Sequence, residues 1–236
     1  MSVDVLLVKS VTAGSEVFFS SNEINKYDLT IDVPLPSIPV LASWIKSKGY
    51  TLDVFDLDRN GYDELLEKAS ACYVIGFYLN YSGHFRVLNA IEQVKKKFPE
   101  KLVVIGGPSI TSLNENFFKL GKSKFFGQIK ESVSNYVDAI VYGEGEIALE
   151  TILQHKDNPD ELGKLIDDDH QNSRGIIYKD TKGNLHISKK PGVVSDLSIL
   201  PIPSFELSKD LLPVAFVETS RGCAFKCPFC EVPGLY

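Results

Sequence analysis

Short apolar runs alternate with amphipathic stretches along the first 155 residues of the chain. The first run, over 3–8, is almost wholly apolar, which is typical of a strand buried on both faces of a sheet. Apolar or alternating runs predict four further strands, over 51–57, 72–79, 102–105 and 139–142. Apolar side chains that recur every three or four positions predict helices over 40–49, 62–70, 85–98 and 113–120, and a further helix that follows the stretch 143–146 and runs to about 154.

Five strands that alternate with helices predict an α/β fold, a doubly wound parallel five-stranded sheet with right-handed crossovers. Ligands of such sheets bind beyond the carboxyl ends of the strands. The segments expected at that edge are the long loop 9–32 and the short stretches 80–83, 106–109 and 143–146.

The second part of the chain has a different pattern. Residues 155–170 are polar and acidic, so we expect a surface excursion there. Two short strands over 174–179 and 184–188 predict a β-hairpin with its turn at 180–183. Residues 196–203 have the character of a linker, and a new strand is predicted over 214–217, directly before three cysteines.

The charge balance and the apolar runs limit the class of protein. Lys and Arg number 25 against 31 Asp and Glu, a formal net charge of −6, which disfavours a broad nucleic-acid surface. No apolar run approaches the roughly 18 residues of a membrane span, and residues 1–8 lack a basic leader. We therefore expect a cytoplasmic protein with no membrane partner.

Cys223, Cys227 and Cys230 form a C-x3-C-x2-C run, and they are the clearest chemical signal in the sequence. Thiolates select soft metals, and three of them can hold three irons of a [4Fe–4S] cluster. The fourth iron then stays open for a small molecule. Structural zinc, which usually takes four protein ligands, and inert thiols are the alternatives. The fourth cysteine, Cys72, lies in an apolar run and is expected in the core.

Residues 219–230 read TSRGCAFKCPFC, which resembles the signature of the radical S-adenosylmethionine (SAM) enzymes. Upstream stretches resemble the cobalamin-binding domain that precedes this signature in the B12-dependent class, namely 34–49, 74–77, 104–108, 142–146, and 174–179 leading to 196–203. The resemblance covers nearly the whole chain. It implies a flavodoxin-like or Rossmann-like cobalamin-binding domain over 1–155, a linker with a β-hairpin over 156–212, and the start of a radical SAM domain, a partial TIM-like barrel, over 213–236.

The resemblance also implies cofactors and roles. Cys223, Cys227 and Cys230 would bind the [4Fe–4S] cluster, SAM would bind the open iron, and Phe229 would lie beside the SAM adenine. Reductive cleavage of SAM would give a 5′-deoxyadenosyl radical, with electrons from a donor such as flavodoxin or ferredoxin. Methylcobalamin would supply a methyl group to an unactivated carbon of a small-molecule or peptide substrate.

The expected cobalamin contacts are the residues at the carboxyl edge of the sheet: Asn80, Tyr81, Ser82, Gly106, Gly107, Pro108, Ser109, Gly143, Glu144, Gly145 and Glu146. Glycines allow the backbone to approach a flat ligand closely. A nucleotide site is the rival, but two carboxylates would then lie beside a pyrophosphate, and no Walker lysine follows. Alternatively, Glu144 and Glu146 offset the dipole of the helix that starts there.

The sequence departs from the family in two respects. The D-x-H-x-x-G motif of many cobalamin proteins is absent, because Ser173 stands at the glycine position that follows Asp168-Asp169-His170. We expect His170 and His84 on the surface. Only six residues follow Cys230, since the chain ends at 236, whereas the family's barrel is far longer. We therefore expect a truncated chain that does not turn over alone.

Two other functions remain open on the sequence alone. The first is a radical SAM enzyme without functional cobalamin, similar to a methylthiotransferase. The second is a non-catalytic corrinoid-binding module.

Overall fold

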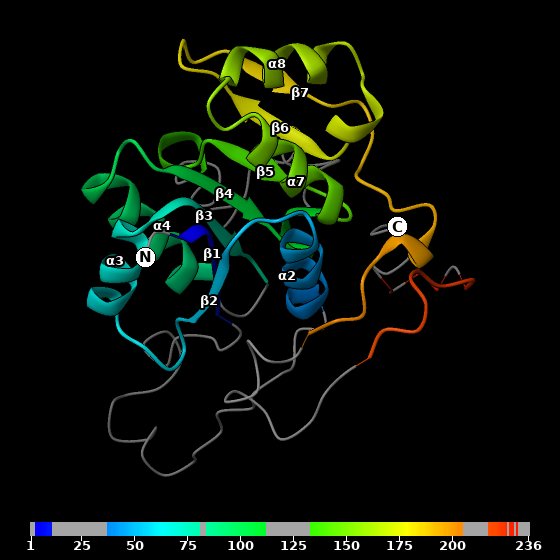
Figure 1. The fold of residues 1–236 in the computed structure, drawn as a ribbon, viewed down its shortest axis with the longest axis horizontal. Coiled ribbons are helices and arrows are strands. Elements are labelled where there is room, and N and C mark those ends of the chain that lie inside the picture. The colour runs from blue at the N-terminus through cyan, green and yellow to red at the C-terminus, as the bar shows by residue number, and fades with distance from the viewer. Residues whose placement is uncertain are drawn as a thin grey trace.

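The structure is a computed structural model that describes residues 3–10, 37–80, 84–111, 133–204, 217–225, 227–228 and 230 (Figure 1). Several predictions made from the sequence lie outside these residues. They are most of the loop 9–32, the helix over 113–120, most of the strand over 214–217, and the roles of Tyr81, Ser82 and Phe229.

Five parallel strands form the main part of the sheet, in the order β2-β1-β3-β4-β5. Their bounds are β1 Val3–Lys9, β2 Leu52–Asp56, β3 Cys72–Tyr78, β4 Leu102–Gly106 and β5 Ala139–Val141. Helices cover both faces: α3 (Tyr62–Ser70) and α4 (His84–Lys97) pack on one, and α2 (Ser37–Ser47) and α7 (Glu146–Gln154) on the other (Figure 1). The doubly wound Rossmann-like arrangement predicted from the sequence is therefore confirmed.

The first strand shows why the apolar runs predict this sheet. Leu6 and Val8 lie in the core under α3 and α4, whereas Val5 and Leu7 lie in the core under α2 and α7. Successive side chains of a strand point to opposite faces, so a strand covered on both faces needs apolar residues at every position.

Within the described residues the sheet has seven strands rather than the expected five. The predicted hairpin is present as β6 (Ile176–Lys179) and β7 (Leu185–Ile187), but it continues the sheet beyond β5 in antiparallel pairing. Ile176, Ile177 and Tyr178 are buried, so β6 covers the edge of β5 with a core strand. A detached linker would leave these apolar side chains in water, and burying them favours the extended sheet.

The expected surface excursion over 155–170 is wrong, because this stretch contains helix α8 (Pro159–Asp167). Leu162 and Ile166, four positions apart, are buried in the same core as α7, while the remaining side chains of the helix are mostly polar. A single narrow apolar stripe is enough here, since α8 packs over β6 and β7. None of the described helices is long and apolar enough to cross a bilayer.

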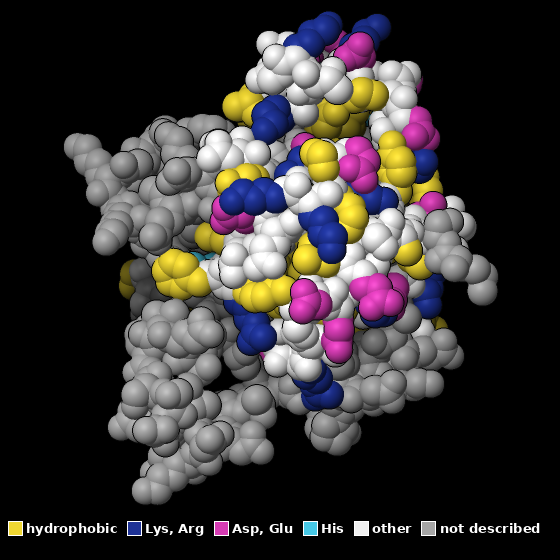
Figure 2. All heavy atoms as spheres, turned by 90° about the vertical axis from the view of Figure 1, so that its left-hand side faces the viewer, with side chains coloured by type: hydrophobic (Ala, Val, Ile, Leu, Met, Phe, Trp, Pro, Cys, Tyr) yellow, Lys and Arg dark blue, Asp and Glu magenta, His cyan; other side chains and the backbone are white. Residues whose placement is uncertain are grey.

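Basic and acidic side chains are interspersed on the side of the molecule where α3 and α4 lie, as the space-filling view shows (Figure 2). Exposed ion pairs such as Lys96–Glu92, within α4, contribute to this mixture. The expectation that the protein has no broad nucleic-acid surface stays a prediction.

Candidate functional site

A pocket of about 300 Å³ lies at the carboxyl ends of the parallel strands. It is lined by residues at the ends of β3, β4 and β5, by the start of α7, and by Glu218 and Arg221. These two residues belong to the segment 218–230, which carries the three clustered cysteines and is called the cysteine segment below. This is the edge at which the topology predicts a ligand. Of the expected cobalamin contacts, seven line the pocket: Gly106, Gly107, Pro108, Gly143, Glu144, Gly145 and Glu146. Asn80, which is half-buried, and Ser109, which is buried, do not.

Two of these glycines are required by the protein's own backbone. Gly107 has φ of +110°, and a Cβ there would lie 2.5 Å from the carbonyl oxygen of Leu79. Gly143 has φ of +79°, and its Cβ would collide with the backbone of Gly192. Both positions therefore exclude other residues whether or not a ligand is bound. Gly145 is different, because a Cβ there meets only Val141 Cγ1, at 3.6 Å.

The loop 143–146 is held on two sides. On one side Gly143 pairs with Gly192, and the Glu144 N–H donates to the Gly192 carbonyl at 2.9 Å. On the other side the Gly143 N–H donates to Thr111 Oγ1 at 3.0 Å. Thr111 Oγ1 in turn donates to the Gly107 carbonyl at 3.3 Å, so it joins two of the glycine turns. Sequence reasoning did not identify Thr111, because a lone threonine carries no pattern.

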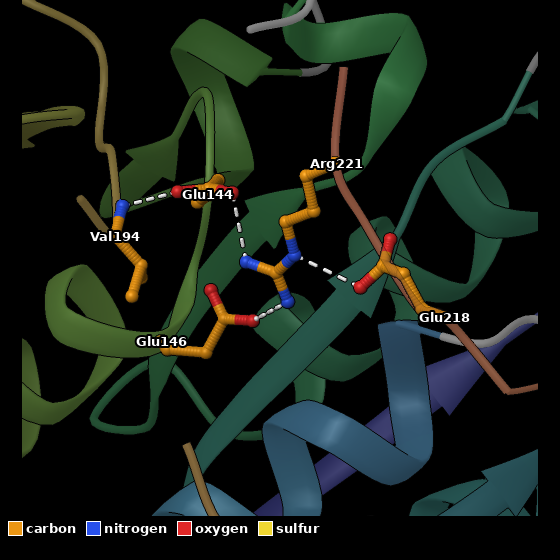
Figure 3. A network of polar contacts seen from close by, with 5 residues as sticks. All are labelled: Glu144, Glu146, Val194, Glu218 and Arg221. Atoms are coloured by element: carbon orange, nitrogen blue, oxygen red, sulfur yellow. Dashed lines mark hydrogen bonds and ion pairs between the residues drawn. The ribbon is translucent and has the colours of Figure 1, made fainter. Parts of the chain in front are cut away.

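Arg221 joins the cysteine segment to this loop (Figure 3). Its Nη1 donates to Glu144 Oε1 at 2.8 Å and its Nη2 donates to Glu146 Oε1 at 2.6 Å. Its Nε donates to Glu218 Oε2 at 2.8 Å, within its own segment. Each guanidinium nitrogen therefore contacts a different carboxylate, and the two contacts at the sheet edge connect residues 77 and 75 positions apart.

These ion pairs are shielded from water. The side chains of Arg221, Glu144 and Glu146 are 9%, 7% and 6% exposed. Burial alone would lower the pKa of Arg221, but the hydrogen bonds and charge of Glu146, followed by the bonds from Glu144 and Glu218, raise it above its usual value. Arg221 is thus a permanent cation that faces three carboxylates.

The second oxygens of the two glutamates differ. Glu144 Oε2 accepts a short hydrogen bond from the Val194 N–H, which ties the loop to the chain that follows the hairpin (Figure 3). Glu146 Oε2 is buried and has no hydrogen-bond partner among the described residues. Glu146 is the first residue of α7, as the helix-dipole interpretation requires, but its main partner is Arg221.

The three clustered cysteines are exposed and form no disulfide. The Cys230 N–H donates to the Cys227 carbonyl at 3.1 Å, which is the turn expected for a short x2 spacing. Within the described part of the chain, no three Cys, His, Asp or Glu side chains are gathered into a metal-binding group. The donor set fits an iron–sulfur cluster, and metal-site loops commonly take their final geometry only when the metal binds.

The other sequence expectations for Cys and His have mixed outcomes. Cys72 is buried, as predicted, and burial raises the pKa of its thiol. His170 is exposed, as predicted. The surface placement of His84 is wrong, because its side chain is buried on the face of α4 that carries Leu88 and Ile91. That i, i+4, i+7 spacing marks the core face of the helix and was readable in the sequence.

Comparison with known proteins indicates a class of enzyme to which the chain is similar. The chain is 26% identical over 164 residues to an uncharacterised methyltransferase of Pyrococcus horikoshii, with 67% of the chain and 31% of that protein covered. It is 26% identical over 169 residues to the cobalamin-dependent radical SAM methyltransferase TokK of Streptomyces tokunonensis, which covers 69% of the chain and 21% of TokK. The chain is similar to methyltransferases.

A third relative has a lower sequence identity to the chain but aligns with it over more residues. The hopanoid C-3 methylase of Methylococcus capsulatus is 22% identical over 213 residues, with 84% of the chain and 36% of that protein covered. No protein-family model matches the chain. The chain thus spans between 21% and 36% of the length of these three relatives.

We expect the buried ion pairs to protect the Arg221–Gly222 bond from trypsin, because the protease must take up the arginine side chain. Cleavage then requires a local opening that breaks the contacts with Glu144 and Glu146. In the double variant Glu144→Gln/Glu146→Gln, cleavage at this bond should accelerate about tenfold or more, measured by mass spectrometry over time.

The Lys182–Gly183 bond in the exposed hairpin turn provides the internal control, since Lys182 has no part in the ion pairs. Its cleavage rate should be the same in both proteins. Equal rates at Arg221–Gly222 in the wild type and the double variant would show that the ion pairs do not hold the segment.

Proposed function

We propose that this chain is the N-terminal part of a cobalamin-dependent radical SAM methyltransferase. The observation that carries the proposal is the contact of Arg221 with Glu144 and Glu146, which brings the C-x3-C-x2-C segment to the rim of the pocket. In this class of chemistry the cluster and SAM together supply a carbon radical on the substrate, and cobalamin supplies the methyl group. Such chemistry requires the two cofactor sites to be neighbours.

The chemistry of the pocket favours a corrin over a nucleotide. Its lining combines apolar side chains such as Leu7, Val104 and Leu149 with glycine backbone, which suits a flat, largely apolar ring. The rim of the pocket carries three carboxylates and one guanidinium, those of Glu144, Glu146, Glu218 and Arg221. A pyrophosphate there would therefore meet net negative charge. The amide groups around a corrin are neutral and can donate hydrogen bonds to carboxylate oxygens. A pocket of about 300 Å³ would hold one edge of the ring.

The cysteine segment has the properties that a cluster site needs. Cys223, Cys227 and Cys230 are exposed and form no disulfide, so all three side chains are accessible to iron. In this proposal they bind the cluster, Phe229 lies beside the SAM adenine, and residues 213–236 begin the catalytic barrel. Electrons come from a donor such as flavodoxin or ferredoxin, and the substrate is a small molecule or a peptide.

A bulky side chain at Gly145 should weaken binding of hydroxocobalamin. Alanine fits at this position, since its Cβ meets only Val141 Cγ1 at 3.6 Å, and φ of −92° suits any residue. A phenyl ring, by contrast, extends into the space beside the α7 N-terminus. Titration followed by the corrin absorption spectrum should show a Gly145→Ala dissociation constant within about threefold of the wild type, and Gly145→Phe weaker by about tenfold, or 1.4 kcal/mol.

If Gly145→Phe binds as tightly as Gly145→Ala, the corrin is not in this pocket. If the wild type causes no spectral change, the chain binds no cobalamin, which favours the radical SAM enzyme without it.

Anaerobic reconstitution tests the cysteine segment separately. The wild type should retain about four iron and four acid-labile sulfide per chain, and Cys223→Ala should lose most of both. Cys72→Ala is the matched control, because it also removes one thiol but from the buried core, and it should retain the cluster. Bound zinc without sulfide, or equal iron in Cys223→Ala and Cys72→Ala, would contradict the assignment.

A further inference from the structure

Arg221 occupies a special place in the cysteine segment, two residues before Cys223. Its contact with Glu218 is local, three positions away, and orients the guanidinium before it reaches the sheet. Its contacts with Glu144 and Glu146 cross to the loop that forms the pocket rim. The Arg221 side chain therefore lies in the cysteine segment and also lines the pocket.

The pocket itself depends on this docking. Glu218 and Arg221 are part of its lining, so the wall on that side exists only while the cysteine segment lies against the loop 143–146. If the segment moves away, the pocket loses that wall, and Glu144 and Glu146 lose their cation. Undocking replaces both charge-assisted hydrogen bonds from Arg221 to the loop by contacts with water, so the docked and undocked arrangements are two distinct states.

We propose that Arg221 is a positioning residue that couples occupancy of the pocket to cluster assembly at the three cysteines. The inference rests on the proposed function and adds a thermodynamic link between its two cofactor sites. A ligand in the pocket contacts a wall that only the docked segment supplies, so it favours docking. Docking fixes the chain two residues before Cys223, which lowers the conformational entropy lost when the thiols gather around iron. Linkage then requires that the cluster strengthen ligand binding by the same factor.

The geometry also explains why lysine cannot replace Arg221 fully. The guanidinium presents two separate N–H groups, one to Glu144 and one to Glu146. A lysine ammonium keeps the charge but is a point donor, so it holds one carboxylate firmly and the other weakly. We therefore expect Arg221→Lys to retain part of the coupling and Arg221→Gln to lose it.

The test measures the dissociation constant of hydroxocobalamin anaerobically, with and without the reconstituted cluster, in four proteins. In the wild type the cluster should tighten binding about fivefold or more. This ratio should fall to about one in Arg221→Gln and to an intermediate value in Arg221→Lys. Lys96→Gln, which removes an exposed cation on α4, is the control and should keep the wild-type ratio.

The outcomes separate this inference from the function on which it rests. A wild type that binds both cofactors with a ratio of one overturns the coupling and leaves the function intact. An unchanged ratio in Arg221→Gln overturns the role of Arg221. A wild type that binds neither cofactor overturns the proposed function together with the inference. If Arg221→Gln does not fold, Arg221→Lys decides, since a ratio equal to the wild type's would contradict the proposal.

Discussion

One buried guanidinium determines where the cysteine segment lies. Arg221 pairs with Glu144 and Glu146 from the loop after β5, and all three side chains are more than nine-tenths buried. Removing one partner of a buried ion pair typically costs about 3–5 kcal/mol, because the remaining charge stays in a medium of low polarity. The two charge-assisted contacts with Glu144 and Glu146 place the C-x3-C-x2-C segment at the carboxyl edge of the sheet.

The fold supplies the rigid side of that contact. The loop 143–146 is fixed by backbone pairing with Gly192, and Tyr142 beside it donates its hydroxyl to the Ser188 carbonyl at 2.6 Å. Both partners lie just after β7, so the antiparallel hairpin supports the pocket rim directly. Ser188 and Gly192 belong to the stretch that the sequence analysis assigns to a linker. This stretch therefore supports the site directly. A site built on a supported loop can place a carboxylate precisely enough to bind a fork-shaped cation.

Local patterns in the sequence predicted the local structure well. Helix α3 matches its predicted bounds, because Gly61 and Ala71 flank a clear amphipathic stretch, and the strands follow from their apolar runs. Helix α8 was missed because only Leu162 and Ile166 mark its buried stripe. The cysteines were found by spacing, since metal-binding loops are local. Arg221 was missed because its partners are 75 and 77 residues away, and no periodicity reports a contact at that distance.

The pairing of Arg221 with Glu146 is tested most directly by a double-mutant cycle in the ligand-free chain. Arg221→Gln, Glu146→Gln and the double variant are compared with the wild type by their free energies of unfolding in urea. A buried contact at 2.6 Å predicts a coupling energy of about 2 kcal/mol, so that the second substitution costs much less than the first. Effects that add within about 0.5 kcal/mol would show that the two residues do not interact and would contradict the docked position of Arg221.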